Sequence, residues 1–462
     1  MPDLHVVILA GGKGTRMRSS MPKVLHRVAG RPMLAYVLDQ AQALSPHTVT
    51  IVVGYLGESV RRAFADSVTV RFVAQEPQLG TGHALLQAAP LLEPMAGTLL
   101  LLSGDVPLLG TDTLERLLRT HESSGAAATV LTARVERPYG YGRVVRADGR
   151  ISRIVEERDA SPAERQIKEV NSGIYVFDLE SLFPALRSLG PQNAQGEYYL
   201  PDLIKVYRRQ QRVIETVTLE RPDEVRGINS RTELAEVSCI VRQKKNEELM
   251  AAGVTLEDPA TTYVDPDVRV GPYTVIHPGV HLEGHTRIGA ACEIHAGVRI
   301  VDSVLEDRVT IRNFCVIQQS RIASGATVGP FAHLRPETEI RQNARVGNFV
   351  ELKKTVLGAG SKANHLAYLG DATIGADVNI GAGTITCNYD GVRKHPTVIE
   401  DGAFIGSDAQ LIAPVKVGRG AYVGSGTTVR ENVPPGALAV SAGQQRNIEG
   451  WVEKKKALSP KP

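Results

Sequence analysis

Glycines and basic residues gather near the amino terminus, where together they could bind a chain of phosphates. They are Gly11, Gly12, Gly14, Lys13, Arg16 and Lys23. A glycine-rich turn between a strand and a helix exposes backbone N–H groups to phosphate oxygens, and cationic side chains neutralise the remaining charge. Met17 excludes a dinucleotide-binding pattern, and no Gly-Lys-Ser/Thr follows, so this is not a Walker A loop. The motif favours a polyphosphate site over a plain tight turn.

Two further positions could contribute chemistry. Asp105 ends the apolar run 97–105, where a carboxylate at the carboxyl end of a strand could hold a Mg²⁺ carried by a phosphate; a turn or cap aspartate is the alternative. Farther along, segment 347–371 places His365 near basic and aromatic side chains. These neighbours are Lys353, Lys354, Lys362 and Tyr368. Such a concentration favours a site, although a core or surface histidine is the alternative.

The first half of the chain alternates strand-like and helix-like segments, which positions the glycine loop and Asp105. The apolar runs are 5–10, 49–54, 97–105 and 127–135, and the helical stretches include 32–43 and 111–121. This order predicts an α/β domain with a Rossmann-like, mostly parallel mixed sheet, whose ligand crevice lies at the carboxyl ends of the strands.

The second half repeats an aliphatic residue every six positions. One register is Val270, Ile276, Leu282, Ile288, Ile294 and Ile300; the next are Leu305, Ile311, Ile317, then Ile322, Val328, Leu334, Ile340, Val346, Leu352, and finally Ile399, Ile405, Leu411, Val417, Val423, Val429. Hexapeptide repetition predicts an all-β parallel β-helix in which each aliphatic residue points inward and stacks on its equivalent 18 residues later.

Glycine is concentrated in this half: 19 of the 44 glycines fall in residues 1–252 and 25 in 253–462. We expect positive φ angles at coil corners such as Gly271, Gly289, Gly375 and Gly406. The narrow core also explains why aromatic residues make up only 5% of the chain. The six-residue period lapses at 384–398, which predicts a loop leaving the coil, and such loops tend to carry function.

These patterns predict a domain at 1–230, a linker helix at 231–252, a β-helix at 253–445 and a frayed basic tail at 446–462. A net charge of +3 suggests neither a nucleic acid nor a membrane partner, and no apolar run nears the ~18 residues of a membrane span. Four cysteines without a CxxC pair or a signal peptide predict a cytoplasmic protein.

A metal site in the β-helix is a weaker expectation. His277 and His295 are 18 residues apart and should stack on neighbouring coils, but the next equivalent position is Asn313. Catalytic zinc normally has three protein ligands, so the sequence favours a stacked surface pair.

Motifs of the first half resemble the sugar-1-phosphate nucleotidyltransferases, and specifically the N-acetylglucosamine-1-phosphate uridylyltransferases. They are LAGGKGTRM with PKVLH, then QLGTGHA, SGDVPL, YGYGR, EVNSGIY and NAQGEYYLPD. The resemblance implies that UTP or the UDP-sugar meets Leu9, Ala10, Gly11, Gly12, Lys23, Gln75, Gly80, Thr81, Ser103, Gly104, Asp105, Gly142, Glu156, Asn171 and Asn229. It also implies that Asp105 and Asn229 coordinate Mg²⁺, and that Arg16 and Lys23 act catalytically by offsetting phosphoryl charge.

The second half resembles hexapeptide acyltransferases, specifically the glucosamine-1-phosphate acetyltransferase half of bifunctional uridylyltransferases. That family implies a left-handed β-helix, a homotrimer and His365 as the general base that deprotonates the sugar amine. It implies that Arg335, Lys353, Tyr368 and Asn379 hold the sugar phosphate, and that Ala382, Asn388, Tyr389, Ser407 and Ser425 meet acetyl-CoA. The family usually has an arginine near Ala442; Arg430 or Arg446 is the candidate substitute here.

The sequence therefore predicts a bifunctional enzyme. It would acetylate glucosamine 1-phosphate with acetyl-CoA, then transfer UMP from UTP to give UDP-N-acetylglucosamine, a cell-wall and lipopolysaccharide precursor, and pyrophosphate. One alternative is a single-activity nucleotidyltransferase with a structural β-helix. The other is a non-catalytic β-helix scaffold with a vestigial first domain.

Overall fold

The computed structural model describes residues 3–65, 69–219, 221–441, 443, 445 and 447–458. Its backbone separates into two compact units, Met1–Val241 and Arg242–Pro462. Among the helices described, none combines the length and the apolar character that crossing a membrane requires.

The first unit is built on one mixed sheet, in the order β11-β7-β10-β6-β1-β4-β5, with β8 and β9 attached beside β10. Its strands are β1 Leu4–Ala10, β4 Thr48–Val53, β5 Val70–Ala74, β6 Thr98–Ser103, β7 Ala128–Arg134, β8 Arg143–Ala147, β9 Arg150–Val155, β10 Glu169–Asp178 and β11 Ile214–Leu219; β2 Arg27–Val28 and β3 Arg31–Pro32 form a separate pair. Only β10, β8 and β9 pair antiparallel within the large sheet. The expected Rossmann-like mixed sheet is confirmed.

Apolar cores cover both faces of this sheet. Along β1, Val6 and Ile8 belong to one core while Val7 belongs to the other, as strand alternation requires. The described helices are α1 Met33–Ala43, α2 Gly57–Ala63, α3 Thr81–Leu86, α4 Ala89–Leu92, α5 Thr111–Ser124, α6 Leu179–Arg187 and α7 Leu203–Arg209. Burial on both faces leaves the carboxyl ends of β1 and β6 as the place where a ligand can meet the sheet.

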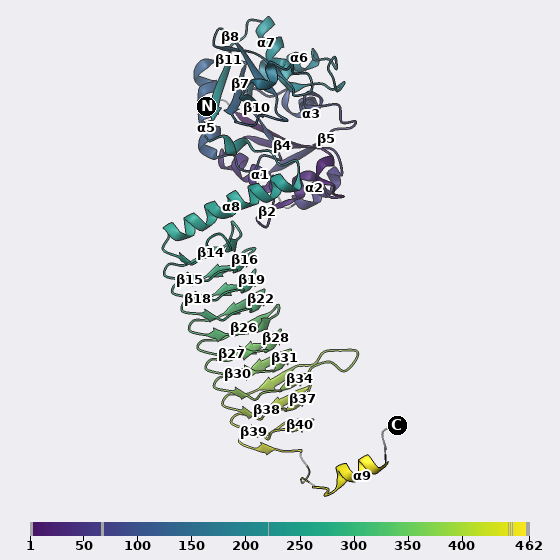
Figure 1. The fold of residues 1–462 in the computed structure, drawn as a ribbon, viewed down its shortest axis with the longest axis vertical. Coiled ribbons are helices and arrows are strands. Elements are labelled where there is room, and N and C mark those ends of the chain that lie inside the picture. The colour runs from purple at the N-terminus through teal and green to yellow at the C-terminus, as the bar shows by residue number, and fades with distance from the viewer. Residues whose placement is uncertain are drawn as a thin grey trace. The chain divides into compact units, whose positions relative to one another are not determined.

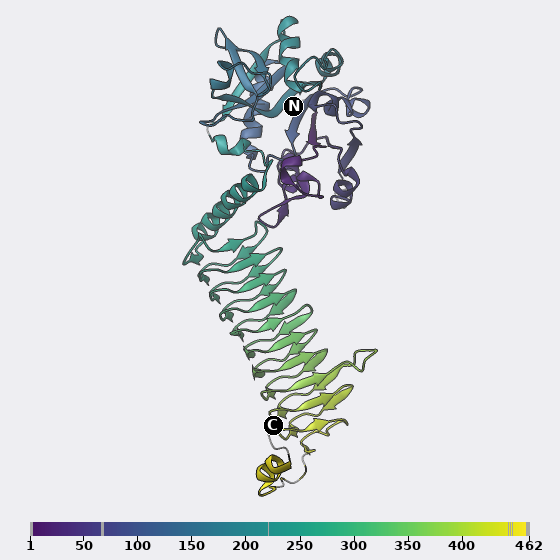
Figure 2. The ribbon, with the colours of Figure 1, turned by 45° about the vertical axis from the view of Figure 1, so that its right-hand side comes forward.

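The second unit is a left-handed parallel β-helix made of three sheets with 11, 10 and 9 strands. The first sheet runs from β12 Thr255–Leu256 to β41 Leu438–Ala439, the second from β13 Tyr263–Val264 to β40 Thr428–Val429, and the third from β14 Arg269–Val270 to β38 Val415–Val417. Successive coils lie in register, so that Ile276 pairs with Ile294. Figures 1 and 2 show the stacked coils and their short strands.

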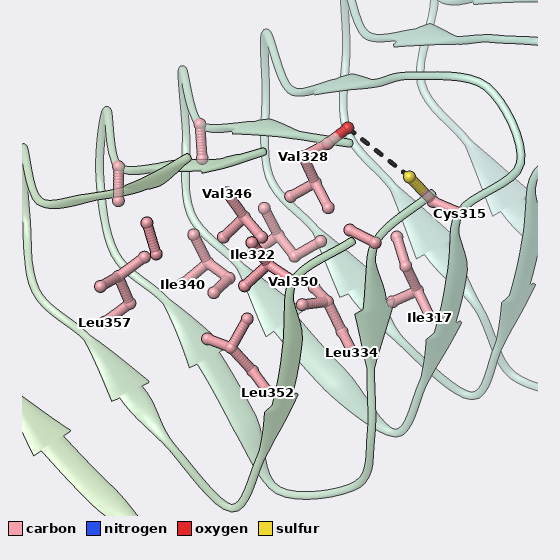
Figure 3. Close-up of a cluster of buried hydrophobic side chains, with 14 of the residues drawn as sticks. Cys315, Ile317, Ile322, Val328, Leu334, Ile340, Val346, Val350, Leu352 and Leu357 are labelled. Atoms are coloured by element: carbon pink, nitrogen blue, oxygen red, sulfur yellow. Dashed lines mark hydrogen bonds between the residues drawn. The ribbon is translucent and has the colours of Figure 1, made fainter. Parts of the chain in front are cut away.

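The six-residue pattern predicts the interior correctly. Every aliphatic residue of the predicted registers is buried, except Val270, which is partly buried at the start of the coil. Figure 3 shows the stacking, with Leu334 and Leu352 as equivalents on successive coils and Cys315 donating its S–H to the carbonyl of Val328 at 3.8 Å. The large aromatic side chains Tyr273, Phe314 and Phe349 lie outside this core, as expected.

The predicted role of the coil glycines is wrong at the four positions proposed. Gly271, Gly289, Gly375 and Gly406 do not have positive φ angles. They are glycines because the next coil is too close: a Cβ on Gly271 would lie 2.7 Å from the carbonyl carbon of Gly289. Positive φ occurs instead at corners, many of them occupied by non-glycine residues such as Phe314.

Three connecting segments refine the expectations. The helix α8, Arg231–Ala251, occupies the predicted linker. The predicted loop 384–398 is shorter in the structure, because β34 Ile385–Cys387 and β35 Thr397–Ile399 remain in the coil, and only the stretch between them projects beside β34 (Figure 1). The tail is not irregular throughout: α9, Trp451–Leu458, forms there because its sequence is rich in helix-forming residues.

Candidate functional sites

Two adjoining cavities open at the carboxyl ends of β1 and β6. The larger, of about 420 Å³, is lined by Leu9, Ala10, Gly11, Gly12, Lys13, Lys23, Val24, Gln75, Gln78, Gly80, Thr81, Ala84, Ser103, Asp105 and Glu197. The smaller, of about 230 Å³, shares Leu9, Thr81, Ser103 and Asp105 with it. It adds Val106, Gly140, Tyr141, Gly142, Glu156, Asn171, Ser172, Gly173, Tyr175, Leu200, Pro201, Val225, Gly227 and Asn229.

The structure thus brings together most of the residues predicted for a nucleotide-sugar site. Two of them line neither cavity. Arg16 lies exposed on a short helix, Thr15–Met17, and Gly104 is buried with its N–H donated to the carbonyl of Leu9 at 2.9 Å. Sequence reasoning did not single out Tyr141, although the motif YGYGR contains it.

The glycine loop is closely packed at Gly11 and open at Gly12. A Cβ on Gly11 would lie 3.3 Å from both Gln75 Oε1 and the backbone nitrogen of Gly54. Gln75 is 5% exposed and donates from Nε2 to the carbonyl of Gly80 at 2.9 Å, so its side chain is held in place. The loop therefore leaves its backbone atoms and the fixed side-chain amide of Gln75 available to a flat ligand such as a nucleobase.

Lys23 lies between the two residues predicted to coordinate Mg²⁺. Its Nζ donates to Asp105 Oδ2 and, at 2.6 Å, to Asn229 Oδ1. Asp105 and Asn229 thus bring two oxygen atoms from distant parts of the chain to one cationic group. Carboxylate and amide oxygens are the ligands that Mg²⁺ prefers. Asp105 and Asn229 fit a magnesium ion that would replace the ammonium group.

Glu156 is the most perturbed carboxylate in the smaller cavity. Burial, reinforced by the negative charges of Asp159, Asp202 and Glu197, raises the pKa of Glu156 to about 6. Gly142 allows this position, since a Cβ there would lie 3.3 Å from Glu156 Oε1. A carboxylate that is costly to ionise inside a cavity is a candidate for accepting hydrogen bonds from a polar ligand.

We expect Glu156→Gln to make the protein more stable at pH 7, by about 1–2 kcal/mol, and to leave it nearly unchanged near pH 4. A raised pKa means that the folded state keeps a proton between pH 4.5 and about 6 that the unfolded state loses. Stability therefore falls as pH rises through that window, and glutamine, which cannot ionise, avoids the loss. Urea unfolding of the native protein and of Glu156→Gln at the two pH values measures the difference in their free energy of unfolding. An equal difference at both pH values would show that ionisation of Glu156 is not its cause.

In the second unit, His365 is held by a neighbouring coil. It lies at the end of β30, Lys362–His365, in register with Asn348 of β27, Arg345–Asn348. Its Nδ1 lies 3.0 Å from Asn348 Oδ1. An amide oxygen can only accept, so Nδ1 carries the hydrogen and Nε2 keeps a free lone pair in the neutral ring. The side chain is exposed, and Asn348 is a positioning residue that sequence reasoning missed.

Residues predicted to meet acetyl-CoA form a row that begins at His365. Lys362 pairs with Asn379 on the next coil, Asn379 pairs with Phe404, and Phe404 pairs with Tyr422. Three residues farther along each strand lie His365, Ala382, Ser407 and Ser425. These four therefore occupy one corner on four successive coils, spaced by about 4.8 Å per coil.

A cluster of cations lies on the second sheet and the projecting loop. Arg335 and Lys353 are adjacent on the second sheet, because Leu334 pairs with Leu352. The projecting loop adds Lys394, whose proximity lowers the pKa of Lys353, with a smaller contribution from Arg335. Neighbouring like charges are costly unless an anion joins them, so the cluster is suited to a phosphate. Lys394 was not singled out from the sequence, although the predicted loop contained it.

The remaining predicted residues divide between faces. Tyr368 belongs to β31, Tyr368–Gly370, on the second sheet, whereas Asn379 belongs to β33, Asn379–Ile380, on the first. Asn388 is buried and donates to Asp371 Oδ2, and Tyr389 is 60% exposed on the projecting loop. Arg430 is exposed, while Ala442 and Arg446 lie outside the described residues.

Comparison with known proteins gives the family. A model of the MobA-like NTP transferase domain matches residues 6–207, a model of the GMPPB C-terminal domain matches 261–335, and a model of bacterial transferase hexapeptides matches 396–431. The bifunctional protein GlmU of Trichlorobacter lovleyi is 50% identical over 97% of this chain and 98% of its own. That of Syntrophotalea carbinolica is 51% identical over 97% of both. The chain belongs to the GlmU family.

GlmU membership decides between the functions left open by the sequence. The match extends over both units, so the β-helix is not a passive addition to a nucleotidyltransferase, nor is the first unit vestigial. This GlmU protein is a bifunctional enzyme, an acetyltransferase and a uridylyltransferase on one chain.

Proposed function

We propose that the first unit performs uridylyl transfer in the paired cavities above β1 and β6, and that the second performs acetyl transfer at the corner occupied by His365. The domain limits we propose are 1–230, 231–252, 253–445 and 446–462. The convergence of Asp105, Asn229 and Lys23 carries the first assignment. The Asn348–His365 pair and the cation cluster on the second sheet carry the second.

In uridylyl transfer, the phosphate of N-acetylglucosamine 1-phosphate attacks the α-phosphorus of UTP and pyrophosphate leaves. The nucleophile is already an anion, so the protein needs no general base. The larger cavity holds the nucleotide along Gly11, Gly12 and Gln75, and the smaller one holds the sugar near Glu156 and Asn171. Mg²⁺, when bound by Asp105 and Asn229, neutralises phosphate oxygens. Lys23, released from those two residues, is then free to meet phosphate charge, as is the exposed Arg16.

In acetyl transfer, the 2-amine of glucosamine 1-phosphate attacks the thioester of acetyl-CoA, and the thiol of coenzyme A leaves. His365 accepts a proton from the amine at Nε2, the nitrogen that Asn348 leaves free. Arg335, Lys353 and Lys394 meet the sugar phosphate, with Tyr368 and Asn379 positioning the sugar. Acetyl-CoA lies along Ala382, Ser407 and Ser425, with Asn388 and Tyr389 beside it, and Arg430 is the described arginine available to its phosphates.

A homotrimer in the cytoplasm completes the proposal. Lys353 and Asn379 belong to different sheets and to coils two steps apart, so their side chains leave one chain from different faces. A partner chain packed against the corner can supply the second face. Trimeric assembly thus accounts for a sugar-phosphate site with residues on two sheets.

The assembly is tested by co-expressing two inactive variants, Lys353→Ala and Asn379→Ala. If different chains supply the two residues, hybrid trimers contain some sites with both native residues, and acetyl transfer recovers to roughly a quarter of the native rate from the statistics of mixing. Each variant co-expressed with itself under a second tag is the control. Absence of recovery in hybrids that sediment as trimers would place both residues in one chain's site.

A further inference from the structure

A compact group of histidine and glutamate side chains lies on the outer face of the first coils. Glu257, His277 and His295 follow β12, β15 Val275–Ile276 and β18 Glu293–Ile294, each directly after an inward aliphatic residue. Strand pairing of Leu256 with Ile276 and of Ile276 with Ile294 stacks these three side chains in one column. Glu293, two residues before His295, points from the same face.

The distances within this His-Glu cluster match those between ligands of one metal ion. The Nε2 atoms of His277 and His295 lie 3.5 and 3.4 Å from Glu293 Oε1. All three ligand atoms lie within 4.8 Å of one another. Tetrahedral zinc with bonds of about 2.0–2.1 Å separates its ligand atoms by roughly 3.3–3.4 Å. Small side-chain adjustments therefore suffice to bring them around one ion.

The surroundings of His277 provide an independent indication. Its Nδ1 lies 3.0 Å from Glu257 Oε2, close enough for the carboxylate to favour a hydrogen on that nitrogen. Its Nε2 is buried and has no hydrogen-bond partner. A histidine that donates one ring nitrogen to a carboxylate and presents the other is the usual arrangement of a metal ligand.

An ordinary ion pair explains these contacts less well. In the neutral ring, His277 Nε2 and Glu293 Oε1 are both acceptors, and nothing in the described structure lies between them to offset their repulsion. A protonated His277 would donate to Glu293, but the 3.5 Å separation does not form that hydrogen bond. A cation placed between the two atoms satisfies both.

We propose that His277, His295 and Glu293 bind one divalent ion of the zinc class, with Glu257 orienting His277. Two imidazoles and a carboxylate suit Zn²⁺ better than Mg²⁺, which prefers oxygen ligands throughout. The rings are stacked with centroids 4.7 Å apart and planes at 6°, so each tilts toward the ion on binding. The ion joins two coils through their side chains.

The position of the cluster gives the ion a structural role. It lies four to five coils before His365. Arg312, and not Asn313 as the 18-residue spacing predicted, occupies the next place in its column, which ends the site on that side. The first coil has no preceding coil to pair with and is covered instead by the end of α8, through Leu249 and Asn246. Binding the native state alone stabilises it by linkage, so the ion protects this end from fraying.

The proposal is tested on the untagged full-length chain carrying Cys239→Ser, which removes an exposed thiol that would compete for zinc. Equilibrium dialysis against Zn²⁺ in excess Mg²⁺ should give one ion per chain. His277→Asn and His295→Asn should lose that ion, Glu257→Gln should bind it about 10–100-fold more weakly, and His285→Asn, on an exposed turn of the same unit, should keep it. Co²⁺ in place of zinc should give the visible absorption of tetrahedral coordination.

Thermal unfolding provides a second readout. Zn²⁺ should raise the Tm of the parent protein and of His285→Asn, but not that of the two ligand variants, whose folding is checked by circular dichroism and by retained acetyl transfer. If a ligand variant does not fold, Glu293→Gln serves in its place. Equal zinc uptake by the parent and by folded His277→Asn would overturn the proposal. A loss of binding in His285→Asn as well would show only adventitious binding by surface histidines.

Discussion

His365→Ala should lower kcat for acetyl transfer by about 10²–10⁴-fold, the usual contribution of a positioned general base, while uridylyl transfer stays unchanged. The ring is exposed at a coil corner, is held by Asn348 and is not part of the buried β-helix interior. The loss is therefore chemical rather than structural. Release of coenzyme A thiol from acetyl-CoA and glucosamine 1-phosphate measures it.

Asn348→Ala separates the effect of losing the orientation of His365 from the effect of losing the base itself. It should reduce kcat less than His365→Ala and change the pH dependence, because the ring loses the partner that fixes its tautomer. His333→Asn, on another column of the β-helix, is the matched control and should be neutral. An unchanged rate of thiol release in His365→Ala would remove the assignment of His365 as the base.

Asp105→Ala should reduce pyrophosphate release by about 10²–10³-fold or more and leave acetyl transfer intact. The variant removes one of the two oxygens that converge on a cation. We also expect the half-saturating Mg²⁺ concentration to rise, which a purely structural role would not produce.

Asp112→Asn is the control for this experiment, because Asp112 lies at the exposed start of α5 and pairs only weakly, at 3.4 Å, with exposed Arg221. Both rates should stay at native values in it. If Asp105→Ala retained normal pyrophosphate release and normal Mg²⁺ dependence, Asp105 would not be part of the metal site.

Periodicity made the β-helix largely predictable. A six-residue repeat specifies which side of the chain faces inward, and nearly every predicted inward residue is buried. The glycine explanation failed because sequence shows that a side chain is absent but not which neighbour excludes it. At Gly271 that neighbour is the backbone of another coil, 18 residues away. Such a contact depends on the spacing of coils, which the order of residues does not display.

The sites were predictable where function is carried by contiguous motifs. Asp105, Gly142 and Asn171 come from separate motifs, and the structure lines one cavity with all three. Asn348 and Lys394 were missed because each acts on a partner distant in sequence, His365 on the next coil and Lys353 across a projecting loop. The stacking of His277 and His295 was predicted and is confirmed. The carboxylates beside them were missed because Glu257 and Glu293 do not share the 18-residue spacing of the two histidines.

The row of His365, Ala382, Ser407 and Ser425 can change in length only by whole coils. Each coil advances the row by one strand spacing, about 4.8 Å, and coils can only be added or removed whole if the inward registers are to stay aligned. The length of surface that the row offers to an elongated ligand therefore changes in steps of one coil. Deleting one complete coil beyond Ser407 should keep the fold and shorten the row by one step. The protein should then fit a shorter ligand, with every residue around His365 unchanged.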